Sequence, residues 1–383
     1  MLGIVLSGGG AKGSYEIGVW KALRKLKIKY DIVTGTSVGS LNGVMMVTGD
    51  YKKALKVWKD INYNNVVDNG TFKKKFDFLK FYTKNFVNGG ARISSLEKLV
   101  EETVDEDKFF KSKIDFGLVA FNFSKLEQKI VKKKDMKRGQ LKKYIIASSS
   151  CYPFFQKKKI NDEKYMDGGY YDNLPINLAI DLGASEIIAV DLKAVGIKRR
   201  VTDKSVHITY IVPNNNIGSL LTFEQGIARK NIKYGFNDTM KVFKKLDGKR
   251  FTFKKKHLNK NYLKYQDKYF KIVLELFPKE TDKIKDKFAF FNKIVEKVGL
   301  LFELDESLIY SRRTFNKKIK NKLYEVKDID YDSKVKKVLS VFSKKEIVKH
   351  FFKMINKDNK KLSNYDLFMH EEVLMAIYLY VIK

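Results

Sequence analysis

Short apolar runs and glycine turns alternate along the start of the chain. Residues 2–6 form an apolar run that stops at a glycine-rich segment, residues 7–13. From Ser14 to Leu26 the apolar positions recur at helical spacing, and a second apolar run, residues 30–34, leads into another glycine turn and another helix. A strand, a glycine turn and a helix, repeated in this way, indicate an α/β sheet whose strand ends carry the chemistry.

Strand and helix signals continue to about residue 243, where the pattern changes. Strands are predicted over 114–121, 128–131, 186–190 and 206–211, and helices over 141–149, 177–182 and 223–243. Beyond Lys244 the glycines become sparse and apolar residues repeat at i, i+3, i+4 and i+7, as they do over residues 291–298. We therefore expect an α/β domain over residues 1–243 and a separate, lysine-rich, mainly helical region over residues 244–383.

Gly35, Ser37 and Gly39 form a Gly-x-Ser-x-Gly turn between a predicted strand and a predicted helix. This is the pattern of a nucleophile elbow, in which strand and helix come so close that both flanking positions must lack a Cβ atom. The serine then stands at a helix N-terminus, whose dipole favours developing negative charge. Ser37 is therefore the candidate nucleophile, supported by Gly35 and Gly39.

The glycine-rich segment after the first strand suits the transition state of such a serine. Acyl transfer passes through a tetrahedral oxyanion, and successive backbone N–H groups at a helix start can point at it. We assign this role to the run Gly8, Gly9, Gly10, Ala11, Lys12 and Gly13. The run also has the spacing of a dinucleotide fingerprint, but that motif requires an acidic residue at the end of the second strand, where Thr36 and Ser37 stand. A phosphate-binding P-loop is excluded because the order is Lys-Gly-Ser rather than Gly-Lys-Ser.

Ser37 needs a base, and the residues leave two candidates. His207 fits the chain order of a Ser-Asp-His triad, although a histidine that simply opens a strand is the plainer interpretation. Asp167 is followed by Gly168 and Gly169, which let its loop pack against the serine turn. Partial desolvation raises the pKa of a carboxyl group toward the operating range, so a Ser–Asp pair is chemically sufficient.

Lys and Arg outnumber Asp and Glu by 77 to 44, which gives a formal net charge of +33. The excess is spread along the chain, +17 over residues 1–243 and +16 over residues 244–383, and so indicates a lysine-rich composition rather than a nucleic-acid-binding arm. Such a surface is attracted to anionic membranes by forces that weaken with salt. We expect an anionic membrane surface as a peripheral partner, and no nucleic acid.

The single cysteine, Cys151, excludes a disulfide framework and a cysteine-based zinc cluster, and no metal site is expected. The N-terminal residues lack the basic start and cleavage site of a signal peptide, and the apolar run at residues 373–382 is too short to span a bilayer. We interpret that run as core packing. These features predict a cytoplasmic protein, or one that is peripheral on the inner membrane face.

Residues 51–113 are predicted to be mostly helix and loop, and within them aromatic and lysine residues are mixed over residues 72–82. Two interpretations of this stretch stay open. It is a lipid-docking cap beside the active site, with lysines at phosphate head groups and phenylalanines in the acyl boundary, or it is an amphipathic helix packed on its own domain.

Three blocks of the sequence resemble the patatin-like phospholipase family, in the family's order. The first is residues 8–13, with Lys12 where many members have arginine; the lysine keeps the positive charge but loses the planar fork. The second is the serine elbow, residues 35–43, and the third is Asp167-Gly168-Gly169 followed by residues 172–175. Residues 147–153 are similar to the segment that usually precedes the third block. The resemblance covers about residues 1–243.

The resemblance implies a three-layer α/β/α sandwich around a central, mainly parallel sheet. It also implies a lipid acyl hydrolase with a Ser37–Asp167 dyad, acting on a phospholipid or other lipid ester without a metal or an organic cofactor. Two alternatives stay open: a lipid acyltransferase with the same dyad, and a non-catalytic basic membrane-surface or signalling module. The resemblance assigns no role to residues 244–383.

Overall fold

The computed structural model describes residues 1–68, 83, 89–278, 284–328, 342–357 and 370–383. The chain divides into two compact units, the N-terminal unit (Met1–Val242) and the C-terminal unit (Phe243–Lys383). The aromatic and lysine-rich stretch at residues 72–82 lies outside the described residues, so both interpretations of it stay open.

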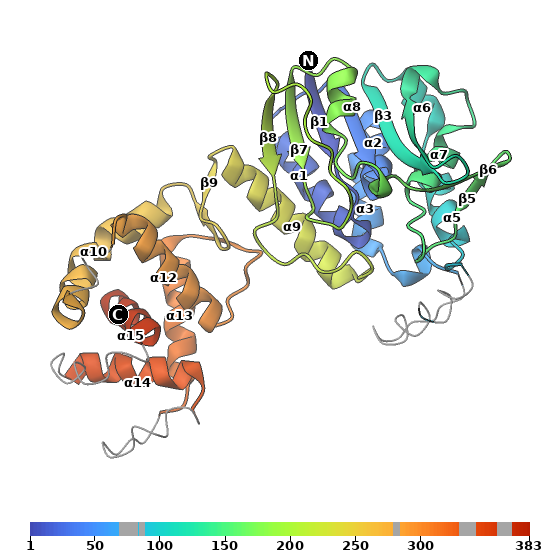
Figure 1. Cartoon of the computed structure of the whole chain (residues 1–383). Helices are drawn as coiled ribbons and strands as arrows, with labels where there is room; N and C mark the ends of the chain where they lie inside the picture. The colour runs from blue at the N-terminus through green and yellow to red at the C-terminus, as the bar shows by residue number, and fades with distance from the viewer. Residues whose placement is uncertain (69–82, 84–88, 279–283, 329–341, 358–369) are drawn as a thin grey trace. The chain divides into compact units, whose positions relative to one another are not determined.

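The N-terminal unit is built on an eight-stranded, mostly parallel sheet (Figure 1). In chain order the strands are β1 (Leu2–Leu6), β2 (Ile32–Thr36), β3 (Asp115–Asn122), β4 (Glu127–Lys132), β5 (Lys158–Ile160), β6 (Glu163–Asp167), β7 (Glu186–Val190) and β8 (His207–Ile211). In space they follow the order β5-β6-β3-β2-β1-β7-β8, and β4 pairs with β3. Strands β1, β2, β3, β7 and β8 run parallel, whereas β4 and β6 run antiparallel to β3.

Helices cover both faces of this sheet. They are α1 (Ser14–Lys25), α2 (Val38–Thr48), α3 (Tyr51–Asp60), α5 (Ser94–Thr103), α6 (Glu106–Lys111), α7 (Leu141–Ser148), α8 (Ile176–Asp181) and α9 (Gln225–Val242). Helix α2 lies close over the face that carries Val33 and Phe116, because a Cβ atom on Gly43 would come within 3.1 Å of both side chains. Helix α8 covers the opposite face, where a Cβ atom on Gly117 would meet Leu178 at 2.8 Å. The predicted three-layer α/β/α sandwich is confirmed.

The β5–β6 hairpin was not predicted, since lysines interrupt its apolar positions. Strand β4 occupies one edge of β3, so β2 and β6 share the other edge. Along that edge Val119 pairs with Thr36, and the next residue, Ala120, pairs with Asp167. Strand β6 therefore meets β2 end to end: β2 turns into Ser37 at the point where β6 ends at Asp167.

The C-terminal unit is mainly helical. It contains α10 (His257–Leu276), α12 (Lys287–Leu301), α13 (Arg312–Glu325), α14 (Lys344–Lys357), α15 (His370–Ile382) and a small sheet of β9 (Leu246–Asp247), β10 (Thr252–Lys254) and β11 (Ile309–Tyr310). Helix α15 packs against α10, α12 and α14, and nine of its residues are buried, so the apolar run at residues 373–382 is core, as predicted (Figure 1). Across the described ranges, no helix combines the length and the apolar character needed to cross a membrane.

Candidate active site

Ser37 sits on a strained turn between β2 and α2. Its backbone adopts φ 55° and ψ −127°, a left-handed conformation that is costly for a residue with a side chain. A Cβ atom on Gly35 would lie 2.3 Å from the carbonyl oxygen of Gly39, and one on Gly39 would lie 2.5 Å from that of Leu6. The Ser37 N–H donates to the hydroxyl of Ser148 at 2.8 Å, which helps to hold the turn. The chain thus has the geometry of a nucleophile elbow, with Gly35 and Gly39 in the supporting places.

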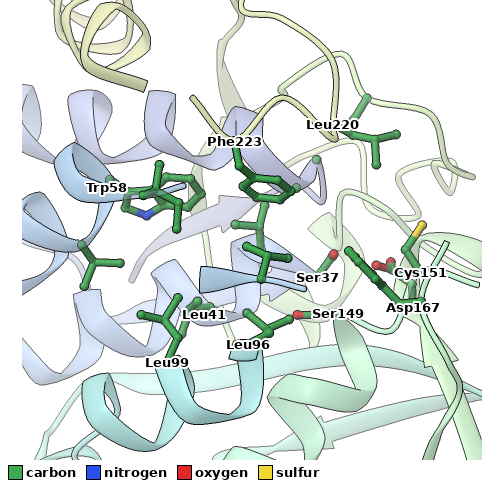
Figure 2. Close-up of a pocket in the computed structure, with 18 of the residues that line it drawn as sticks. Ser37, Leu41, Trp58, Leu96, Leu99, Ser149, Cys151, Asp167, Leu220 and Phe223 are labelled. Carbon is green, nitrogen blue, oxygen red and sulfur yellow. The ribbon is translucent and has the colours of Figure 1, made fainter. Parts of the chain in front are cut away.

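Asp167 is the partner that the fold brings to Ser37. Both side chains are buried, the Ser37 hydroxyl faces the carboxylate, and the carboxylate accepts a hydrogen bond from the Gly169 N–H at 2.8 Å (Figure 2). Burial raises the pKa of Asp167 to about 6, and the interactions with the Ser37 side chain and with the Gly169 N–H limit the rise. Figure 2 shows the two groups side by side at one end of a pocket. A carboxyl group with this pKa is deprotonated at neutral pH and still basic enough to accept a proton.

The glycine-rich run lies beside Ser37, where it continues from β1 into a short 3-10 helix (Gly10–Gly13). Gly9 and Gly10 line the pocket, and the described residues hold no acceptor for the N–H group of either. Three other N–H groups of this run already have acceptors. Gly8 donates to the carbonyl of Asn173 at 3.0 Å, Ala11 to that of Leu220 at 2.8 Å and Lys12 to that of Gly9 at 3.1 Å. Two adjacent donors are therefore available to an oxyanion.

Close packing explains why this run is glycine-rich. Gly10 has φ +54°, and a Cβ atom there would lie 2.3 Å from the carbonyl oxygen of Leu220. At Gly13 a Cβ atom would meet Val38 at 2.5 Å. The Lys12 ammonium donates to the carbonyl of Lys193 at 3.3 Å, and burial lowers its pKa. Lys12 thus ties the run to the loop after β7.

A mostly apolar pocket extends from Ser37 between α2, α3 and α5 (Figure 2). Leu41 and Met45 line it four and eight residues after the serine, so along α2 it reaches about 12 Å. Trp58 and Leu99 line it from α3 and α5. The pocket has the length and lining of a site for an aliphatic chain whose reacting end lies at Ser37.

The other candidate base, His207, lies elsewhere. It is the first residue of β8, whereas Ser37 follows the last residue of β2, and because these strands run parallel the two residues lie at opposite ends of the strands. Three strand spacings separate β8 from β2, about 14 Å. His207 is exposed and opens a strand, as the plainer interpretation had it.

Cys151 lines the pocket near Asp167. Burial and the nearby carboxylate raise the pKa of its thiol well above the ordinary value, so the group is a neutral thiol at physiological pH.

Two further aspartates near the site have structural partners. Asp172 accepts from the N–H of Leu174 at 3.2 Å, and Asp191 pairs with Lys198 at 2.6 Å. Among the residues that the structure describes, no group of three or more His, Cys, Asp or Glu side chains gathers as metal ligands would.

Several residues of the site escaped the sequence analysis. The carbonyl group of Asn173 holds the Gly8 N–H, and its side chain lines the pocket. Val195, Leu220 and Phe223 line the pocket from the long connections on either side of β8. These connections have no periodic pattern that would have pointed to Val195, Leu220 or Phe223. Asn173 alone lies in a recognisable sequence block, residues 172–175.

Comparison with known proteins relates the N-terminal part of the chain to one family. A family model described as Patatin-like phospholipase matches residues 4–180. A patatin-like phospholipase domain-containing protein of Caenorhabditis elegans is 29% identical over 197 residues, which are 51% of this chain and 14% of that protein. Lysophospholipase NTE1 of Candida albicans is 28% identical over 199 residues, or 51% of this chain and 13% of that protein. The chain therefore aligns with only a small part of these curated relatives.

Among solved structures, the crystal structure of VipD from Legionella pneumophila is similar at a TM-score of 0.40 and 15% identity, covering 100% of this chain and 91% of that one. The family match includes all three sequence blocks, at residues 8–13, 35–43 and 167–175. The resemblance is therefore confirmed, and the chain carries a patatin-like phospholipase domain at residues 4–180.

Proposed function

We propose that the chain is a serine hydrolase of lipid acyl esters, with residues 1–243 as its catalytic domain. The observation that carries the proposal is the Ser37 hydroxyl facing a buried Asp167 carboxylate, beside two unengaged N–H groups and at the head of an apolar pocket. The lysophospholipase name of one relative points to the same substrate class.

The proposed reaction has two steps. The Ser37 hydroxyl attacks the ester carbonyl carbon while Asp167 accepts its proton, and the N–H groups of Gly9 and Gly10 donate to the oxyanion. Asp167 then returns the proton to the leaving alcohol as the C–O bond breaks. Water then attacks the acyl carbon while Asp167 accepts its proton. Asp167 returns this proton to the Ser37 oxygen as the bond between that oxygen and the acyl carbon breaks, which releases the fatty acid and restores the serine.

A fluorophosphonate probe and fatty-acid release from phospholipid vesicles test this proposal. The wild type should be labelled and release fatty acid, whereas S37A should do neither. D167N should lower kcat by at least about 100-fold, and H207A should leave it unchanged. Absence of labelling above S37A would instead support a non-catalytic lipid-surface module, and full activity in D167N with none in H207A would overturn the choice of base.

The transacylase alternative differs only in the group that attacks the acyl-enzyme. Lipid products formed with an added acceptor alcohol distinguish it, because a hydrolase yields free fatty acid whereas a transacylase yields a new ester.

An anionic membrane surface is the proposed peripheral partner. Val195 lines the pocket yet is 92% exposed, and Ile197 beside it is 50% exposed. Lys193, Lys198 and Arg199 lie exposed in the same loop. Apolar side chains flanked by cations suit insertion between anionic head groups at the mouth of the pocket.

A further inference from the structure

A concavity on the C-terminal unit is lined by five basic side chains, and the described residues that line it include no acidic one. It lies between α10, α13 and the end of α15. The cations are Lys264, Arg312, Arg313, Lys317 and Lys320. We call this the basic concavity.

Most charges of the basic concavity are not neutralised by the part of the protein that the structure describes: Lys264, Arg312, Arg313 and Lys317 form no ion pair with a carboxylate there. Lys320 is the exception, because it donates at 2.8 Å to the main-chain oxygen of Lys383, the last residue of the sequence. Elsewhere in the same unit lysines do find acidic partners, as Lys345 does with Glu303 at 2.7 Å. The concavity therefore concentrates positive charge, and this concentration does not stabilise the fold.

Three of its residues form a stripe along α13. Arg313, Lys317 and Lys320 stand at i, i+4 and i+7, a spacing at which like charges destabilise a helix. Phe315 and Ile319 on the other side of the helix are fully buried and hold it to the core. The buried face accounts for the packing of α13, and among the described residues Arg313 and Lys317 form no hydrogen bond or ion pair that would offset the cost of their repulsion.

The floor of the basic concavity is rigid. Asn316, which lines it, donates to Asn261 at 3.1 Å and accepts from Tyr378 at 2.9 Å, and Asn261 in turn donates to the Tyr378 hydroxyl at 3.1 Å. These three buried side chains form a closed ring of hydrogen bonds that joins α13, α10 and α15. A fully satisfied buried network fixes the spacing of the helices that present the cations.

We propose that the basic concavity binds a compact anion that carries several phosphate groups. Two adjacent arginines can grip phosphate oxygens in pairs, and the lysines add point charges around them. The stripe on α13 is about 10 Å long, which suits a small polyphosphorylated group better than an extended nucleic-acid strand. This chemistry belongs both to soluble inositol phosphates and to phosphorylated lipid head groups.

Titration calorimetry on the full chain tests the site, with inositol hexakisphosphate as the probe. R313Q/K317Q should weaken binding by at least about tenfold, because two charge-assisted contacts are lost. K271Q/K318Q is the matched control, since it also removes two positive charges, one from α10 and one from α13, at exposed positions outside the concavity. This control should bind the probe within about twofold of wild type. Thermal unfolding of both variants establishes that they fold.

Sedimentation with phosphatidylcholine vesicles that contain phosphatidylinositol bisphosphate distinguishes the two sources. Vesicle binding that R313Q/K317Q loses and the control keeps would assign the site to a lipid head group, whereas hexakisphosphate binding without vesicle binding would assign it to a soluble ligand. Equal weakening in both double variants, or no binding of either probe by wild type, would overturn the proposal. Tighter binding of a single-stranded oligonucleotide than of hexakisphosphate, lost in R313Q/K317Q, would replace it with nucleic-acid binding.

Discussion

Asp167 couples the proposed chemistry to pH. Its burial raises the pKa to about 6, and only the deprotonated carboxylate can accept the serine proton. We therefore expect kcat/KM on a soluble ester to fall about tenfold per pH unit below 6 and to be level above it. A profile measured from pH 4.5 to 8 checks this, and a midpoint near 4 or a loss of activity as the pH rises to 7 would contradict it.

A second buried carboxyl group, Glu16, affects stability. It accepts from the Asn42 amide at 2.7 Å, its other oxygen has no partner in the described structure, and Trp58 donates to Asn42 at 2.8 Å. Burial raises the pKa of Glu16 to about 8, above an unfolded value near 4.5. The folded state therefore holds the proton more tightly, and the free energy of unfolding falls as pH rises from about 4.5 to 8.

E16Q should remove this penalty. Glutamine keeps an acceptor for Asn42 without an ionisable group, so the variant should gain on the order of 3 kcal/mol over wild type by pH 8 and little at pH 5. Both tryptophans, Trp20 and Trp58, lie in the N-terminal unit, so their fluorescence during urea unfolding reports on that unit alone. E16A, which loses the hydrogen bond, should destabilise at both pH values; a pH-independent effect of E16Q would contradict the assignment.

At the scale of elements, the pocket between α2, α3 and α5 sets which acyl chains fit. L99W adds bulk to its α5 wall and should lower kcat/KM for long-chain esters by at least about tenfold while short-chain esters change little. K98W on the same helix is the control, because the Lys98 side chain is 79% exposed and does not line the pocket. Equal losses for short and long esters in L99W would show that the pocket does not select chain length.

The elements also show what a sequence pattern can reveal. The glycine turns around Ser37 and at residues 8–13 were predictable because close backbone approach admits so few residue types. Strand β6 was not, since its pairing with β3 depends on residues more than forty positions away, and the pattern placed Asp167 in a loop. The pairing of Asp167 with Ser37 came from the family resemblance and from the chemistry of a buried carboxyl.

At the scale of the whole molecule, the loop after β7 is expected to dock on membranes. V195D should reduce hydrolysis of anionic vesicles by at least about tenfold more than hydrolysis of a soluble ester, because a charge is costly in the acyl boundary. V195L, which stays apolar, is the control at the same position. Equal losses on both substrates in V195D would mean that Val195 acts on the active site itself.

The basic concavity could not be predicted from the sequence. The basic concavity joins Lys264 of α10 to Arg313 of α13 across about fifty positions of the chain, and helical periodicity could identify each helix but not their contact. Net charge was visible from composition. Its concentration at one place is a property of the folded C-terminal unit.

The meeting of β2 and β6 on one edge of β3 has a consequence for how this chain tolerates change. Side chains of a strand alternate between the two faces of its sheet, so a slip of β6 by a single residue would turn the carboxylate of Asp167 away from Ser37. An inserted residue in the Asn161–Asp162 turn can loop out, whereas one inserted between Tyr165 and Asp167 shifts the alignment itself. The β5–β6 hairpin therefore has one register that places Asp167 beside Ser37. The number of residues between Glu163 and Asp167 is as constrained as the identity of Asp167 itself.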